Sequence, residues 1–186
     1  MEEEKILKEV ESRMEKTLSA LKGDLNKVRT GRASLALFDD IRVDYYGTPT
    51  PLNQLASMAV PEPRLITIQP WDTSVIQEIE KAILKSELGL TPMSDGKIIR
   101  ISIPRLTEER RKELVKVIKK MGEASKVALR NLRREANEQL KALEKNKKIS
   151  QDQLRQWMEK VQAATDKSIE KVDGLLSAKE KEILEI

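Results

Sequence analysis

The side chains of this sequence that could do chemistry are its cations, because the usual catalytic residues are missing. The 186 residues include 0 Cys and 0 His, which removes thiol chemistry and the commonest general base and metal ligand. No Gly belongs to the G-x-x-x-x-G-K pattern of a phosphate-binding loop. Asp39 and Asp40 are adjacent acids before a predicted strand, which is typical of a turn. The sequence therefore favours a binding protein without catalytic residues, metal or cofactor over an enzyme.

A row of cations at helical spacing is the main chemical signal. Residues 105–148 hold 15 of the 35 Lys and Arg but 7 of the 31 Asp and Glu, which leaves 20 against 24 elsewhere. The row comprises Lys112, Lys116, Lys119, Lys126, Arg130, Arg133, Lys141 and Lys145. A phosphate backbone is the natural counter-surface for such a row, so we expect it to bind RNA or DNA. The alternative is a solvated helix face, which is the usual meaning of a charge run.

One long helix, predicted from Leu106 to Asn146, must position this row. Its apolar residues recur by threes, fours and one seven, which indicates a single buried stripe. The stripe comprises Leu114, Ile118, Met121, Ala128, Leu132, Ala136, Leu140 and Leu143. Leu114 follows Lys112 by two residues, or about 200° around the axis. One side of the helix is therefore expected to be buried, and the other to carry the positive charge.

Two more helices are predicted to pack against this one. The first runs from Glu2 to Thr30–Gly31, and the last begins at a capping box formed by Ser150 and Gln153. Their predicted inward residues are Leu7, Val10, Met14, Leu18, Leu21, Leu25 and Val28, and Leu154, Trp157, Val161, Ile169, Val172, Leu176 and Ile183. The short joint Lys147–Ile149 makes the second and third helices antiparallel.

The segment between the first two helices differs from them in composition, because it is rich in proline and in short apolar runs. Five of the seven Pro lie between Pro49 and Pro70, which excludes a long helix there. The segment is predicted to hold strands at Ile41–Tyr46, Leu65–Ile68 and Ile98–Ile103, a weaker strand at Ala56–Val60, a turn at Thr48–Pro51, and a helix over Val75–Ile83 capped by Thr73 or Ser74. A small sheet crossed by one helix follows from this order.

These elements predict an α+β fold. Residues 1–30 and 105–186 would form an elongated antiparallel three-helix bundle, and residues 31–104 an inserted β-rich (β/α/β) domain. The chain would cross between the two at Thr30–Gly31 and at Pro104–Arg105, where we expect a hinge. No apolar run reaches the roughly 20 residues of a membrane span, and Met1–Lys5 does not resemble a signal peptide. A cytoplasmic protein is the expectation.

Several blocks, in order along nearly the whole chain, resemble bacterial ribosome recycling factor. They are Arg29-Thr-Gly-Arg-Ala-Ser34, Tyr45-Tyr-Gly-Thr-Pro-Thr-Pro-Leu52, Gln54-Leu-Ala56, Thr107-Glu-Glu-Arg-Arg-Lys112 and Arg130-Asn-Leu-Arg-Arg-Glu-Ala-Asn137. The resemblance implies an L-shaped protein whose helical bundle lies on large-subunit ribosomal RNA. It also implies that the second domain swings, and that elongation factor G with GTP is the partner in splitting the post-termination ribosome into subunits.

The resemblance adds residues to the candidate RNA-binding set. Matched to the family, the RNA contacts would include Arg29, Arg32, Arg110, Arg130 and Arg133. Four lysines of the charge row and the asparagine of the last motif complete the candidate set. The full set is Arg29, Arg32, Arg110, Lys112, Lys119, Lys126, Arg130, Arg133, Asn137 and Lys141. The expected partners are the ribosome and elongation factor G, with no membrane, and the chain is expected to be a monomer. The alternatives are a helical coiled-coil tether and a chaperone-type exchange factor.

Overall fold

The computed structural model describes residues 1–185, which form two compact units. The first, called here the helical unit, consists of Met1–Leu25 and the chain from Arg111 onward. The second, the β unit, is Asn26–Arg110. The fold is therefore α+β, with the β unit inserted between the first and second long helices, as the sequence predicts.

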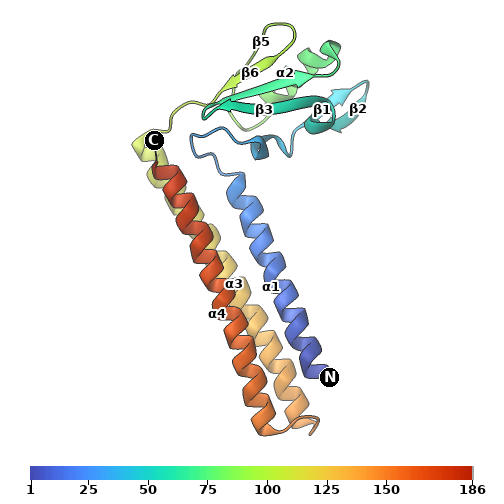
Figure 1. The fold of residues 1–186 in the computed structure, drawn as a ribbon, viewed down its shortest axis with the longest axis vertical. Coiled ribbons are helices and arrows are strands. Elements are labelled where there is room, and N and C mark those ends of the chain that lie inside the picture. The colour runs from blue at the N-terminus through green and yellow to red at the C-terminus, as the bar shows by residue number, and fades with distance from the viewer. Residues whose placement is uncertain (186) are drawn as a thin grey trace. The chain divides into compact units, whose positions relative to one another are not determined.

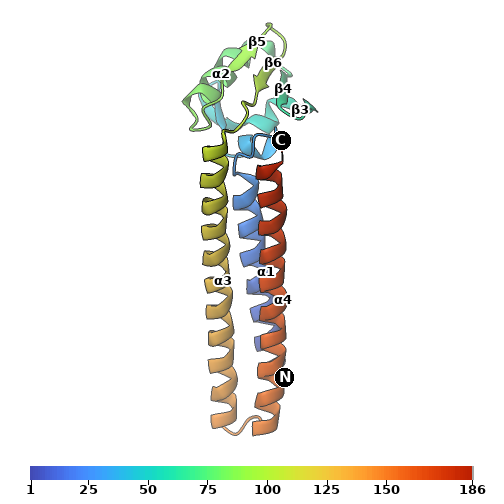
Figure 2. The same cartoon turned by 90° about the vertical axis from the view of Figure 1, so that its left-hand side faces the viewer.

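The helical unit is built from three long helices that run side by side, in both views of the molecule (Figures 1 and 2). These are α1 (Glu2–Asn26), α3 (Glu108–Lys145) and α4 (Gln151–Leu184). The predicted capping box of α4 is present, because the Gln153 amide donates to the Ser150 hydroxyl and the Ser150 amide donates to the Gln153 side chain. The short connection before it makes α3 and α4 antiparallel, as expected.

The buried stripe of α3 differs from the prediction at two positions. Met121 and Ala128 are half-buried, whereas Gly122 and Leu129 are buried. Gly122 is buried because it faces α4 closely: a Cβ atom there would collide with the Cδ1 atom of Leu176. The close approach of two helices decides this choice, and the spacing of apolar residues within one helix cannot predict it.

Helix α1 ends at Asn26, before the predicted end at Thr30–Gly31. The residues after it are bound to the β unit instead of continuing the helix. The Lys27 ammonium pairs with Asp40 at 2.9 Å, and Arg29 donates from Nη1 to the Leu88 carbonyl oxygen at 3.3 Å. Gly31 has a φ of 78°, a left-handed conformation that suits glycine.

The β unit contains a hairpin and a four-stranded antiparallel sheet (Figure 1). The hairpin joins β1 (Arg42–Tyr45) to β2 (Thr48–Pro51). The sheet has the order β3-β4-β6-β5, with β3 (Ala56–Glu62), β4 (Leu65–Pro70), β5 (Pro92–Ser94) and β6 (Ile99–Ser102). Helix α2 (Ile76–Lys85) lies between β4 and β5 in the chain. The four predicted strands are confirmed, and β2 and β5 are additional.

Two local predictions for the β unit were wrong. The segment Thr48–Pro51 was expected to be a turn but is strand β2, and the turn is formed by Tyr46 and Gly47, which both have positive φ. Two such residues make the tight connection that suits hairpin twist. The cap before α2 is Asp72, whose carboxylate accepts from the Ser74 amide at 2.9 Å. A 3-10 turn, Thr73–Val75, separates this cap from α2.

The core of the β unit is aliphatic and well enclosed. Its fully buried members include Val43, Ile66, Ile68, Ile79, Ile83, Ile99 and Ile101, each 0% exposed. These residues come from the hairpin, from the two central strands and from α2, so all three parts share one core. None of the helices formed by residues 1–185 combines the length and apolar character that a membrane span needs.

The turn between β5 and β6 is organised by one carboxylate, which gives a testable pH dependence. Hydrogen bonds from the Ile98 amide, from the Arg100 guanidinium and from the Lys97 amide hold the pKa of Asp95 well below its usual range. Because this pKa is lowered in the folded state, Asp95 stabilises the fold above about pH 4 and loses that effect as the pH falls.

We therefore expect Asp95→Ala to destabilise the protein at pH 7 and to do so less at pH 3. Urea unfolding midpoints of both proteins at the two pH values measure this. A difference between the two proteins that is the same at pH 7 and pH 3 would show that the ionised carboxylate has no such role.

Candidate RNA-binding surface

The outward face of α3 carries a dense row of cations. At about 100° per residue, seven of them fall within a sector of roughly 80° on the side away from the buried stripe. We call these the outward row: Lys112, Lys116, Lys120, Arg130, Arg134, Lys141 and Lys145. All are exposed except Arg130, which is half-buried. Arg130 donates from Nη1 to Glu123 at 3.2 Å, an exposed pair that water and salt weaken.

A second set of three cations lies at the seam between α3 and α4. Lys119, Lys126 and Arg133 are seven residues apart, so they line one edge of α3. The Lys119 ammonium lies 3.8 Å from Glu180, and the Lys126 ammonium lies 2.6 Å from Asp173. These two predicted RNA-binding residues are thus paired with acids of α4. Arg133 differs, because its Nη1 donates to the side-chain oxygen of Gln162, which carries no charge, at 3.4 Å.

Asn137 lies one turn after Arg133 on α3, beside the outward row. Its side chain is half-buried, and its Oδ1 atom is buried without a hydrogen-bond partner among residues 1–185. Asn137 therefore lies among the predicted cations, although its amide points partly into the protein.

The three remaining candidate arginines, Arg29, Arg32 and Arg110, all belong to the β unit. The half-buried Arg29 donates to the Leu88 carbonyl oxygen, so at least one of its donors serves the fold. Arg32 and Arg110 are exposed and take part in interactions of their own. The Arg110 backbone amide donates to the Thr107 hydroxyl at 3.2 Å, so Thr107 caps the start of α3.

The candidate hinge residues differ in their surroundings. Thr30 is buried, whereas Pro104 and Arg105 are exposed. A Cβ atom at Gly31 would lie 3.3 Å from Cγ of Leu106, so the two predicted crossings of the chain approach each other here. Both the space and the positive φ at Gly31 favour glycine.

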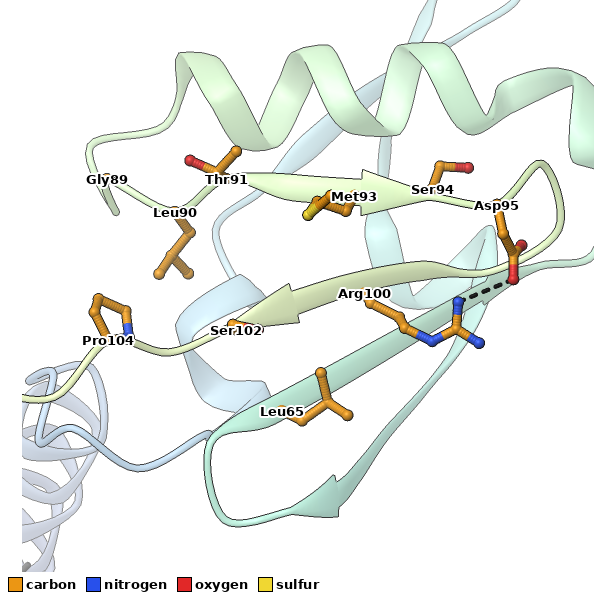
Figure 3. Close-up of a pocket in the computed structure, with 10 residues that line it drawn as sticks. All are labelled: Leu65, Gly89, Leu90, Thr91, Met93, Ser94, Asp95, Arg100, Ser102 and Pro104. Atoms are coloured by element: carbon orange, nitrogen blue, oxygen red, sulfur yellow. Dashed lines mark hydrogen bonds and ion pairs between the residues drawn. The ribbon is translucent and has the colours of Figure 1, made fainter.

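A hollow of about 610 Å³ lies in the β unit, on strands β5 and β6 and the loop before them (Figure 3). Its lining is Leu65, Gly89, Leu90, Thr91, Met93, Ser94, Asp95, Arg100, Ser102 and Pro104. The charged groups of this lining are Asp95 and Arg100, which pair with each other at 2.9 Å. The carboxylate of Asp95 is thus held by Arg100 and by the Lys97 and Ile98 amides of its own turn. Among residues 1–185, no group of three or more His, Cys, Asp or Glu could hold a metal ion.

Comparison with protein families decides what this arrangement belongs to. The family model described as ribosome recycling factor matches residues 21–184. The chain belongs to the ribosome recycling factor family. A ribosome-recycling factor of Syntrophobacter fumaroxidans is 62% identical, covering 97% of this chain and 98% of its own. One from Nitratidesulfovibrio vulgaris is 60% identical over the whole of both chains.

Solved structures of ribosome recycling factors share the fold. A solution structure of the factor superposes with a TM-score of 0.81 at 44% identity, covering 100% of this chain and 99% of that one. The T. thermophilus ribosome recycling factor gives a TM-score of 0.69 at 43% identity, covering 98% of this chain and 99% of that one. It is described with E. coli elongation factor G, bound to the E. coli post-termination complex.

The structure also brings forward cations that sequence reasoning left out of the candidate set. Lys120 and Arg134 lie in the outward row, although neither was predicted as a binding residue. Projecting every Lys and Arg of α3 at 100° per residue would have found both. The same projection places Lys119, Lys126 and Arg133 nearer to the edge of the buried stripe, but it cannot show which acids they meet.

Proposed function

We propose that this chain splits the post-termination ribosome into subunits, after release of the nascent chain, together with elongation factor G and GTP. The observation that carries the proposal is membership of the ribosome recycling factor family over residues 21–184. The T. thermophilus relative, described with elongation factor G on the post-termination complex, supports the same partners for this chain.

The proposed RNA-binding surface is the outward face of α3. Phosphate contacts need exposed cations that are not already neutralised. Lys120, Arg134 and Lys141 of the outward row form no ion pair within residues 1–185, and Arg130 pairs with an exposed acid of its own helix. Lys119 and Lys126 are instead paired with acids of α4. We propose that Lys112, Arg130 and Lys141 of the outward row contact large-subunit ribosomal RNA, together with Arg133 at the edge of this face and with Arg134 and Lys120 as additions. We also propose RNA contacts for Asn137, Arg29, Arg32 and Arg110.

We further propose that this factor contributes binding and movement but no catalytic step. GTP hydrolysis would come from the partner, since the sequence has no phosphate-binding loop.

The proposed domains are residues 1–30 with 105–186, and residues 31–104, with a hinge at Thr30–Gly31 and Pro104–Arg105. Energy transfer between fluorescent labels on the two domains tests the hinge, and one fixed efficiency in all states would contradict it. A cytoplasmic monomer is the corresponding cellular form.

The decisive experiment is a subunit-splitting assay with purified post-termination ribosomes, elongation factor G and GTP. Light scattering should fall when the chain is added and should stay constant when any one component is omitted. The purified chain alone should release no phosphate from GTP. A chain that sediments without ribosomes in a sucrose gradient and splits none would instead fit the coiled-coil tether or the exchange factor.

A further inference from the structure

The seam between α3 and α4 is a ladder with a regular register. The cations of α3 at 119, 126 and 133 are each seven residues apart, and so are the acids of α4 at 180, 173 and 166. Since the two helices are antiparallel, position 119 faces 180, 126 faces 173, and 133 faces 166. The first two rungs are direct ion pairs, Lys119 with Glu180 and Lys126 with Asp173. The register predicts a third pair between Arg133 and Asp166.

That third pair is absent from the described residues, because a glutamine lies between the two charges. Gln162 precedes Asp166 by one helical turn. Its Nε2 donates to Asp166 Oδ1 at 2.8 Å, and its Oε1 accepts from Arg133 Nη1 at 3.4 Å. The carboxylate is thus satisfied by an amide, and the guanidinium contacts a neutral oxygen.

We propose that Gln162 is a positioning residue that keeps Arg133 from pairing with Asp166 and so leaves its guanidinium for an RNA phosphate. The inference rests on the proposed function and names a residue of α4 that no sequence motif pointed to. Gln162 does not itself contact the RNA. It acts through Arg133, and it is needed only because Asp166 stands at the position where the other two rungs carry their acids.

The physical reason is that a carboxylate and an amide oxygen differ in how many donors of an arginine they occupy and in whether they cancel its charge. A guanidinium has five N–H donors in a planar fork, and a carboxylate can accept two of them while cancelling the charge. A phosphate must then displace that carboxylate before it can bind. The Gln162 oxygen accepts from one donor and cancels no charge. It also restrains the long side chain, which lowers the entropy lost when a phosphate is bound.

The test compares single and double variants of the full chain in binding to purified large ribosomal subunits. Gln162→Ala should weaken binding roughly three- to fivefold, because the freed Asp166 captures Arg133 with the strength of an exposed ion pair. Gln162→Ala combined with Asp166→Asn should restore binding to the wild-type value, since the competing charge is then gone. Asp166→Asn alone should bind as the wild type, because Gln162 already keeps Asp166 from Arg133. A gain confined to the double variant therefore excludes both a structural role of Gln162 and a general effect of the lost negative charge.

Two further variants make every outcome decisive. Gln156→Ala removes an exposed glutamine of the same helix and should bind as the wild type. Arg133→Ala should weaken binding about tenfold, as expected for a lost hydrogen bond between charged groups. If Arg133→Ala binds normally, the proposed RNA contact itself fails. If Arg133→Ala binds weakly but Gln162→Ala binds normally, or is not rescued by Asp166→Asn, the role of Gln162 is refuted and the RNA contact stands.

Discussion

Replacing Leu132 with alanine is expected to lower the free energy of unfolding of the helical unit by about 2–5 kcal/mol. Leu132 lies on the buried side of α3, 8% exposed, beside Val10 of α1 and Ala136. Truncation removes three buried carbon atoms and leaves a cavity between two long helices that cannot easily collapse. A bundle without a thick core depends on each layer of its apolar stripe, which is why a single truncation is costly.

Urea unfolding followed by circular dichroism measures this effect. Arg134→Ala is the matched control, because Arg134 is two residues away on the exposed side of the same helix. Its effect should stay within about 0.5 kcal/mol. Equal destabilisation by the two substitutions would mean that the assignment of the inward and outward sides of α3 is wrong.

Replacing Arg130, Arg133 and Arg134 together with alanine is expected to weaken binding to the large ribosomal subunit by roughly 100- to 1,000-fold. Each lost hydrogen bond to a charged phosphate is worth about one order of magnitude. The three side chains lie on adjoining turns of α3, Arg130 and Arg134 in the outward row and Arg133 at the edge next to α4. The fold should be retained, because none of the three is buried. Equilibrium binding of a labelled chain to purified subunits gives the dissociation constants.

A control variant separates local contact from a change in total charge. Lys22, Arg155 and Lys167 are exposed cations of α1 and α4. Replacing these three with alanine alters the net charge by the same amount but leaves α3 intact. It should weaken binding far less, through the general field alone. Equal losses in the two triple variants would mean that α3 has no special role in RNA binding.

The features that the sequence predicted well are those set by neighbouring residues. The Ser150–Gln153 capping box requires only side chains three residues apart, and it forms as expected. The end of α1 was missed because it depends on contacts of Lys27 and Arg29 with residues distant in the chain. Strand β2 was missed because its Pro residues suggested a turn, although proline is tolerated in a two-stranded hairpin.

The candidate site divides in the same way. Helical spacing correctly placed Lys112, Lys116, Arg130, Lys141 and Lys145 on the side away from the core, since that depends on α3 alone. It was wrong to group Lys119, Lys126 and Arg133 with them, because these three lie at the seam with α4. Which cations are neutralised depends on the register between α3 and α4, which pairs Lys126 with Asp173 and interposes Gln162 between Arg133 and Asp166. No pattern within α3 contains that information. The structure therefore makes Lys119 and Lys126 weaker candidates for phosphate contact than the sequence alone suggested.

The dependence of binding on salt tests most directly the central claim that this face of α3 contacts RNA phosphates. The dissociation constant for purified large subunits would be measured at several salt concentrations for the wild type and for the Arg130, Arg133 and Arg134 triple alanine variant. Each lost phosphate contact should reduce the slope of log affinity against log salt by about 1. The account predicts a slope shallower by about 2 to 3 in the variant. Identical slopes for the two proteins would contradict it.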